Sequence, residues 1–223
     1  MTRLLVLAEG DSEELFVKRM LAPHLASHSV YATPTLVETR RLADGRKLGG
    51  GNRWPRVRDS LKPLLADSDA WVTTLLDFYG LPDDFPGAIP ARTARTPDAG
   101  VALLEQQLAA AIEHPPRFIP FFALHEFEAW YFSAPEKVGE HFDHAELESR
   151  LAQVVRTCGG PEQINHGADT HPSARLHTLG VGFRKTREIS LLEKIGIPTI
   201  RNACPHFAQW LSRLEALGTP SSR

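Results

Sequence analysis

The most constraining feature of this chain is an apolar segment near its amino terminus that ends in an acidic residue. Residues 3–8 read Arg-Leu-Leu-Val-Leu-Ala, and Glu9 and Gly10 follow directly. A short, nearly continuous apolar run that stops at a glycine is typical of a strand buried on both faces, as in a parallel sheet. Because open α/β sheets place their ligands at the carboxyl ends of strands, Glu9 is predicted to lie at a functional edge.

A helix is expected directly after this strand. Asp11 is a favourable N-cap residue, and Glu14 stands three residues later, as in a capping box. An apolar stripe at helical spacing follows, formed by Phe16, Val17, Met20, Leu21 and Leu25. Pro23 is expected to kink or break this helix. Strand, acidic turn and helix together predict the first half of a βαβ unit.

A second apolar strand also ends in a carboxylate. Residues 70–77 read Ala-Trp-Val-Thr-Thr-Leu-Leu-Asp, so the run closes on Asp77. Two carboxylates side by side repel each other unless a cation lies between them. Mg²⁺ and Mn²⁺ take oxygen ligands and keep waters for a substrate phosphate. Glu9 and Asp77 together therefore predict metal-assisted phosphoryl chemistry, although either acid alone is equally compatible with a solvated surface charge.

Further acidic candidates follow these two. A strand is expected over residues 118–124, with an edge position or bulge at Pro120. On a helix that starts after it, Glu126 and Glu128 lie about 200° apart, so only one can face the same site. The alternative for either glutamate is a favourable interaction with the helix dipole. Asp83, close in sequence to Asp77, is a candidate outer ligand.

One segment is basic although the net charge of the chain is −2. We expect this segment to follow a nucleic-acid backbone. Its glycine-rich part lacks the Gly-Lys-Ser/Thr ending of a nucleotide-binding P-loop, which excludes that motif, and the alternative is an ordinary surface turn. The basic residues are Arg40, Arg41, Arg46, Lys47, Arg53, Arg56 and Arg58.

The length of 223 residues suits one α/β core with a helical addition. Residues 1–135 are expected to form the core, a mostly parallel sheet flanked by helices. Residues 136–223 are expected to be helical and packed on it as one compact unit. No stretch approaches the roughly 18 apolar residues of a membrane span, so we expect a cytoplasmic protein without membrane contact. The ten histidines are widely scattered, and we expect no zinc site from them.

Several motifs follow one another in a fixed order along almost the whole chain. They are Glu9-Gly10, Leu-Asp-Phe-Tyr-Gly-Leu-Pro at 76–82, Phe-Pro-Gly at 85–87, Leu-His-Glu-Phe-Glu-Ala-Trp at 124–130, Pro-Ser-Ala-Arg-Leu at 172–176, Lys185, and Ile-Arg-Asn-Ala-Cys-Pro-His-Phe at 200–207 with Trp210-Leu211. On these motifs the sequence closely resembles the bacterial domain-of-unknown-function family 4276 (DUF4276). The resemblance implies a Toprim-like fold, the metal-binding α/β domain shared by topoisomerases, primases and overcoming-lysogenization-defect nucleases.

The resemblance also implies roles for single residues. Glu9 matches the Toprim glutamate and Asp77 the first aspartate of the Asp-x-Asp motif, whereas the second aspartate falls on Tyr79. A Phe-Glu-x-Trp motif of related Toprim-like proteins matches residues 127–130, which favours Glu128 over Glu126 as the third carboxylate. Glu9, Asp77 and Glu128 are therefore the expected ligands of Mg²⁺ or Mn²⁺, with Glu126 and Asp83 as secondary candidates.

The leading hypothesis is a metal-dependent phosphodiesterase, an endonuclease acting on DNA or RNA in bacterial anti-phage defence. Glu9 is expected to act as a metal ligand or as the general base. Lys185 and Arg175 are expected to bring positive charge to the phosphate oxygens. Because Tyr79 replaces an aspartate, the alternative is an inactive Toprim-like scaffold or sensor subunit that works with a partner ATPase of the AAA or ABC type.

Overall fold

A parallel sheet forms the centre of the protein, for which a computed structural model describes residues 1–37, 52–113, 115–164, 167, 169–178, 180, 182–184 and 186–219. The strands lie in the order β2-β1-β3-β4, and β5 pairs with β3 beyond the end of β4. Every strand pair in these residues is parallel, which confirms the predicted α/β class. The strands are β1 (Thr2–Ala8), β2 (Val30–Leu36), β3 (Ala70–Asp77), β4 (Phe118–Ile119) and β5 (Phe122–Ala123).

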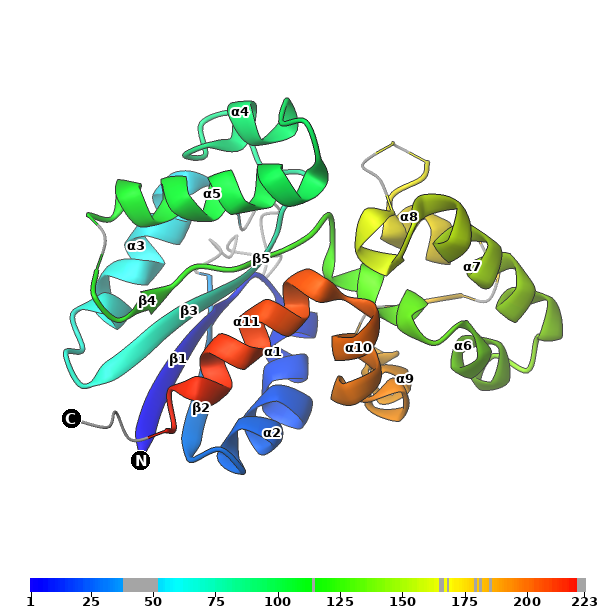
Figure 1. The fold of residues 1–223 in the computed structure, drawn as a ribbon, viewed down its shortest axis with the longest axis horizontal. Coiled ribbons are helices and arrows are strands. Elements are labelled where there is room, and N and C mark those ends of the chain that lie inside the picture. Colours follow the sequence, from blue (N-terminus) through cyan, green and yellow to red (C-terminus); the bar gives the residue numbers. More distant parts are fainter. Residues whose placement is uncertain are drawn as a thin grey trace, which may run out of the picture.

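Helices cover both faces of this sheet (Figure 1). Side chains alternate across a strand, so Leu4 and Val6 of β1 enter one apolar cluster and Leu7 enters the other. The first face carries α1 (Asp11–Phe16), the π-helical turn η1 (Val17–Leu21), α2 (Ala22–Ala26) and α11 (Pro205–Ala216). The second face carries α3 (Trp54–Leu65) and α5 (Pro97–Ala111), with the short α4 (Ala88–Arg92) against α5.

The remaining helices lie beyond the carboxyl end of the sheet, on the right of Figure 1. Trp130 and Leu151 from this region share one apolar cluster with Phe16 of α1 and Phe207 of α11. Residues 136–223 thus share a core with residues 1–135, and α11 lies on the sheet itself. The helices of this region are η2 (Phe127–Ser133), α6 (Pro135–His141), α7 (Ala145–Cys158), η3 (Pro161–Gln163), α8 (Pro172–His177), α9 (Ile189–Ile195) and α10 (Ile197–Ala203).

Three local features depend on backbone chemistry. The first helix is capped by Gly10, whose carbonyl accepts the amide of Glu14 at 3.0 Å, so the expectation of an N-cap at Asp11 was wrong. A π-helical turn precedes Pro23 and marks the irregularity expected there. Pro120 interrupts the strand expected over residues 118–124, because proline has no amide to donate, and the strand divides into β4 and β5.

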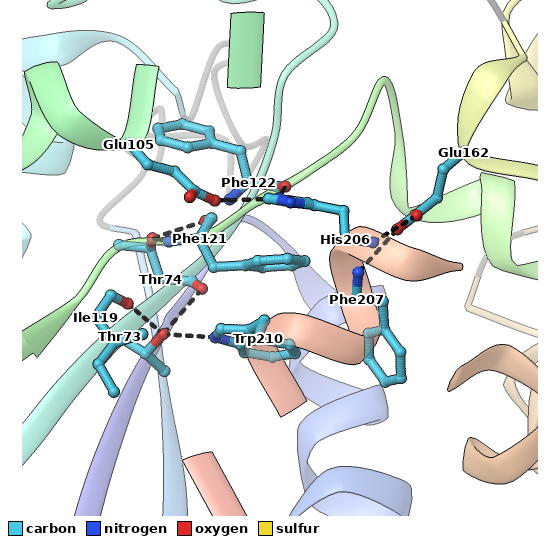
Figure 2. Close-up of polar contacts among 10 residues, drawn as sticks. All are labelled: Thr73, Thr74, Glu105, Ile119, Phe121, Phe122, Glu162, His206, Phe207 and Trp210. Atoms are coloured by element: carbon cyan, nitrogen blue, oxygen red, sulfur yellow. Dashed lines mark hydrogen bonds and ion pairs between the residues drawn. The ribbon is translucent and has the colours of Figure 1, made fainter. Parts of the chain in front are cut away.

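Two buried threonines of β3 hold the interrupted strand and α11 in place (Figure 2). The Thr73 hydroxyl donates to the carbonyl of Ile119 at 2.6 Å and accepts the indole N–H of Trp210 at 2.9 Å. The Thr74 hydroxyl donates to the carbonyl of Phe121 at 2.7 Å and accepts its amide at 2.8 Å. The Phe121 ring stacks on Trp210, with centroids 4.2 Å apart. Side-chain hydrogen bonds thus replace the ladder where Pro120 breaks it.

A double-mutant cycle tests this arrangement. Thr73→Val leaves the buried indole N–H of Trp210 without its acceptor, so we expect the free energy of unfolding to fall by about 1–3 kcal/mol. In a Trp210→Phe background the same change should have a clearly smaller effect, because the donor is already gone. Urea unfolding of the four proteins measures the coupling, and the exposed Thr93→Val serves as control. Equal effects of Thr73→Val in both backgrounds would contradict the assigned hydrogen bond.

Candidate metal centre at the carboxyl edge of the sheet

The direction of chain progression reverses between β1 and β3. From β1 the chain runs through α1 and α2 on one face to β2 on one side, then through α3 on the opposite face to β3 on the other side of β1. Such a switch point leaves a crevice at the carboxyl ends of the two strands, where open α/β sheets bind their ligands. Glu9 directly follows β1 and Asp77 ends β3, so both predicted acids belong to this switch point.

The two acids are in contact through a backbone hydrogen bond. The amide of Glu9 donates to the carbonyl of Leu75 at 3.1 Å, which extends the ladder by one residue. The amide of Asp77 then donates to Oε2 of Glu9 at 2.9 Å. Glu9 is half-buried, and Asp77 is 7% exposed. The predicted convergence of these two segments at one edge is therefore present in the structure.

The segment of the third predicted acid meets the same edge. Oδ1 of Asp77 accepts the amide of Phe127 at 2.8 Å, and the amide of Tyr79 donates to the carbonyl of His125 at 2.6 Å. Glu128, in the first turn of η2, follows Phe127 directly and is completely buried. Phe127 packs edge to face against Trp130, as core side chains. The apolar packing of η2 thus fixes the backbone that holds the Asp77 carboxylate.

The spacing of possible metal-ligand atoms differs between this acidic edge and a second group of polar side chains elsewhere in the structure. In the described part of the chain, the one group of three ligand atoms from His, Cys, Asp or Glu within 4.8 Å of one another is His24, His28 and Glu215. The ligand atoms of Glu9, Asp77 and Glu128 therefore do not all lie within that spacing of one another. The sequence does contain a signal for this second group, because His24 and His28 are four residues apart. The expectation of no zinc site did not take this spacing into account.

The Glu126 carboxylate bonds to residues at the start of α8. Its Oε2 accepts the amide of Ser173 at 2.8 Å and lies 3.0 Å from Nδ1 of His171, and its Oε1 accepts the Ser173 hydroxyl at 2.9 Å. The His171 ring in turn stacks on Tyr79, with centroids 4.5 Å apart. Both oxygens of Glu126 thus serve to attach the first turn of α8 to the edge of the sheet.

Other predicted site residues are placed as follows. The Asp83 side chain is 77% exposed and forms an ion pair with Arg92 at 2.6 Å, at the surface. Arg175 lies in α8 and donates from Nε to the carbonyl of Thr170 at 2.6 Å. Lys185 lies outside the described residues.

The basic segment is described only in part. Arg53 is exposed at the start of α3, and Arg56 is half-buried in its first turn. Arg58 pairs with Asp59 at 3.0 Å and lines a cavity of about 500 Å³ whose wall includes Pro115, next to the amino end of β4. Arg58 therefore faces away from the acidic edge. Arg40, Arg41, Arg46 and Lys47 lie outside the described residues.

A buried ionisable network, not expected from the sequence, supports the edge from the side of α11 (Figure 2). Glu162 accepts the amides of His206 and Phe207 at 2.8 and 2.9 Å. Nε2 of His206 lies 3.1 Å from Oε1 of Glu105 and 3.1 Å from the carbonyl of Phe122. Because Phe122 pairs with the residue before Asp77, the network fixes β5 beside the candidate centre.

The network shifts two pKa values in the same direction. Burial lowers the pKa of His206, but the hydrogen bond and charge of Glu105, with the charge of Glu162, outweigh it and raise the pKa above its usual value. Burial raises the pKa of Glu162, and the amides of Phe207 and His206 offset only part of that effect. Both groups bind a proton more tightly in the folded protein than in the unfolded chain.

Stability should therefore fall as pH rises. The contribution of His206 is fully present below the unfolded-state pKa of histidine, about 6.5, and is lost as pH rises through the higher folded pKa. The expected slope is at most about 1.4 kcal/mol per pH unit for one proton. Urea unfolding between mildly acidic and mildly alkaline pH measures it. His206→Gln should flatten the decline and the exposed His177→Gln should retain it; an unchanged decline in His206→Gln would contradict the assignment.

Comparisons with known proteins place the chain in a family. No helix among the residues described is both long and apolar enough to cross a membrane. No curated protein and no solved structure matches the chain. The family model described as "Domain of unknown function (DUF4276)" matches residues 8–215, which is most of the chain. The chain therefore belongs to the DUF4276 family.

Proposed function

We propose that this chain is a metal-dependent phosphodiesterase that acts on nucleic acid. The observation that carries the proposal is the hydrogen bond from the amide of Asp77 to Oε2 of Glu9, at 2.9 Å. It holds the Glu9 carboxylate against the backbone of Asp77 at the switch point of a parallel sheet, where such folds bind ligands. Adjacent carboxylates in a partly buried crevice repel each other, and a cation between them removes that repulsion.

The donor set fits a hard divalent cation. Glu9 and Asp77 offer only carboxylate oxygens, and Mg²⁺ is commonly bound by one or two carboxylates together with waters and substrate phosphates. A pair of acids therefore suffices, and Glu128 would become a third ligand only if its carboxylate moved closer to the pair. When bound, Mg²⁺ or Mn²⁺ would neutralise charge on the phosphate and lower the pKa of a bound water.

The protein groups around the pair supply orientation and positive charge. The Asp77 amide fixes the orientation of the Glu9 carboxylate, as a metal ligand or a general base requires. Arg175 lies on α8, whose first turn Glu126 ties to the backbone next to Phe127. We assign to Arg175, and to Lys185, the contact with phosphate oxygens, since charged donors stabilise the developing charge of phosphoryl transfer.

The basic and aromatic residues around the acidic edge favour a nucleic-acid strand as the substrate. Arg53 precedes α3 and Arg56 lies in its first turn, and both would contact backbone phosphates from this end of the helix. Tyr79, half-buried and stacked on His171, offers an aromatic side chain close to Asp77 against which a base can pack. The four basic residues between 40 and 47 extend this proposed contact.

One observation favours the second candidate function, an inactive scaffold or sensor that works with an ATPase. On the resemblance to Toprim proteins Tyr79 falls at the position of their second aspartate, and its ring packs against His171 with an interplanar angle of 21°. Tyr79 offers no carboxylate at this position, and carboxylates are the protein ligands that bind Mg²⁺ most commonly. A chain limited to one ion would then depend on its partner, or would bind nucleic acid without cutting it.

Isosteric variants test the enzymatic proposal. Plasmid DNA and total RNA are incubated with the chain in Mg²⁺ and in Mn²⁺, alone and with a co-encoded ATPase. Asp77→Asn keeps an oxygen for the Phe127 amide, and Glu9→Gln keeps one for the Asp77 amide, so both should fold. We expect each to lower the cleavage rate by about 10²- to 10⁴-fold, the range for loss of a general acid–base group.

Asp83→Asn is the matched control, because this carboxylate is exposed and paired with Arg92, and it should cleave at the wild-type rate. Cleavage that persists unchanged in Asp77→Asn would refute the role of the acidic pair. No cleavage by the wild type under any of these conditions would instead favour the scaffold. Release of phosphate from mononucleotides alone would indicate a nucleotide hydrolase.

A further inference from the structure

A second group of potential metal ligands lies where the N-terminal helical segment meets the last helix. His24 belongs to α2, His28 follows the end of that helix, and Glu215 belongs to α11. Nε2 of His24 lies 2.7 Å from Oε1 of Glu215, and Nε2 of His28 lies 3.8 Å from the same oxygen. One ligand atom from each of the three side chains lies within 4.8 Å of the other two.

The spacing of the two histidines explains their convergence. Residues four apart on a helix project from the same face, and the two imidazole rings lie side by side with centroids 5.3 Å apart. Two histidines at this spacing can bind one zinc ion from a single helix face, and a carboxylate from another element completes a three-ligand set. Here α11 supplies that carboxylate from nearly two hundred residues further along the chain.

Hydrogen bonds explain the positions of His24 and Glu215 but not that of His28. Oε1 of Glu215 accepts from Arg201 at 2.9 Å and bonds to His24, whereas 3.8 Å is too long for a hydrogen bond to His28. Within the residues that the structure describes, Oε2 of Glu215 has no hydrogen-bond partner. The ring of His28 is thus held close to Oε1 of Glu215 without a hydrogen bond that explains its position.

Arg201 keeps the carboxylate in place and ionised. It donates to Glu215 and, through Nη2, to the hydroxyl of Ser212. Burial tends to raise the pKa of Glu215, but the hydrogen bonds from His24 and Arg201 outweigh it and lower the pKa below its usual value. The positive charge of Arg201 opposes a cation, so it should weaken binding while it orients the ligand.

We propose that His24, His28 and Glu215 bind Zn²⁺ or a similar borderline transition-metal ion. Imidazole nitrogens favour such ions, whereas the all-oxygen pair Glu9 and Asp77 favours Mg²⁺ or Mn²⁺, so the chain has two sites of different chemistry. The three protein ligands leave one tetrahedral position for water or an outside ligand. Binding would cross-link α2 to α11 and stabilise the attachment of the last helix to the sheet.

His28→Gln separates metal binding from the metal-free contacts. Since His28 makes no hydrogen bond to Glu215, its loss should leave the melting temperature of the metal-free protein nearly unchanged. Calorimetric titration of tag-free protein with Zn²⁺ should show one site in the wild type and an affinity at least tenfold lower in His28→Gln. The exposed His177→Gln, and a Glu9→Gln/Asp77→Asn double variant, should bind Zn²⁺ as the wild type does.

Cobalt provides a second readout. Co²⁺ in the wild-type site should give the visible absorption bands of a tetrahedral ion, and these bands should be lost in His28→Gln. The proposal is overturned if the wild type binds no Zn²⁺, or if His28→Gln binds it as tightly as the wild type. It is equally overturned if the Glu9→Gln/Asp77→Asn variant loses the zinc site, because the ion would then belong to the acidic edge.

Discussion

The parallel pairing of β1 with β3 is the constraint on which the rest of the structure depends. Register places Ala8 beside Leu75, so Glu9 comes one residue later on its strand and Asp77 two residues later on the other, within reach of each other at the same edge. The backbone amide of Asp77 then bonds the Glu9 carboxylate, and the Asp77 carboxylate bonds the first turn of η2. A one-residue slip would turn every side chain of a strand to the opposite face, so the apolar faces of β1 and β3 also determine which acids meet.

Much of this arrangement can be predicted from sequence, because it follows from local pattern. The buried strands over residues 2–8 and 70–77 are apolar runs that stop at an acid. The interruption at Pro120 follows from its missing amide. These features need only periodicity, the chemistry of proline and glycine, and the rule that parallel strands end at a common edge.

The contacts that the sequence did not reveal join distant segments. Glu126 ties to Ser173, His206 to Glu105, and Trp210 to Thr73, across separations of 47 to 137 residues. A single sequence gives no signal for such pairings, because the same residue types also suit a solvated surface. Asp11 shows the same limit locally, because the extended backbone of Gly10 moved the helix start by one residue.

The π-helical turn at Val17–Leu21 sets the rotational phase of the first helical segment. A π turn contains one residue more than an α turn, and each residue of an α-helix rotates the chain by about 100°. The turn therefore lets Phe16 face the core while His24, further along, faces α11. If all of these residues instead formed a regular α-helix, both imidazoles would turn away from Glu215 by up to about 100°, whereas a deletion of one residue within the turn would leave their direction nearly unchanged.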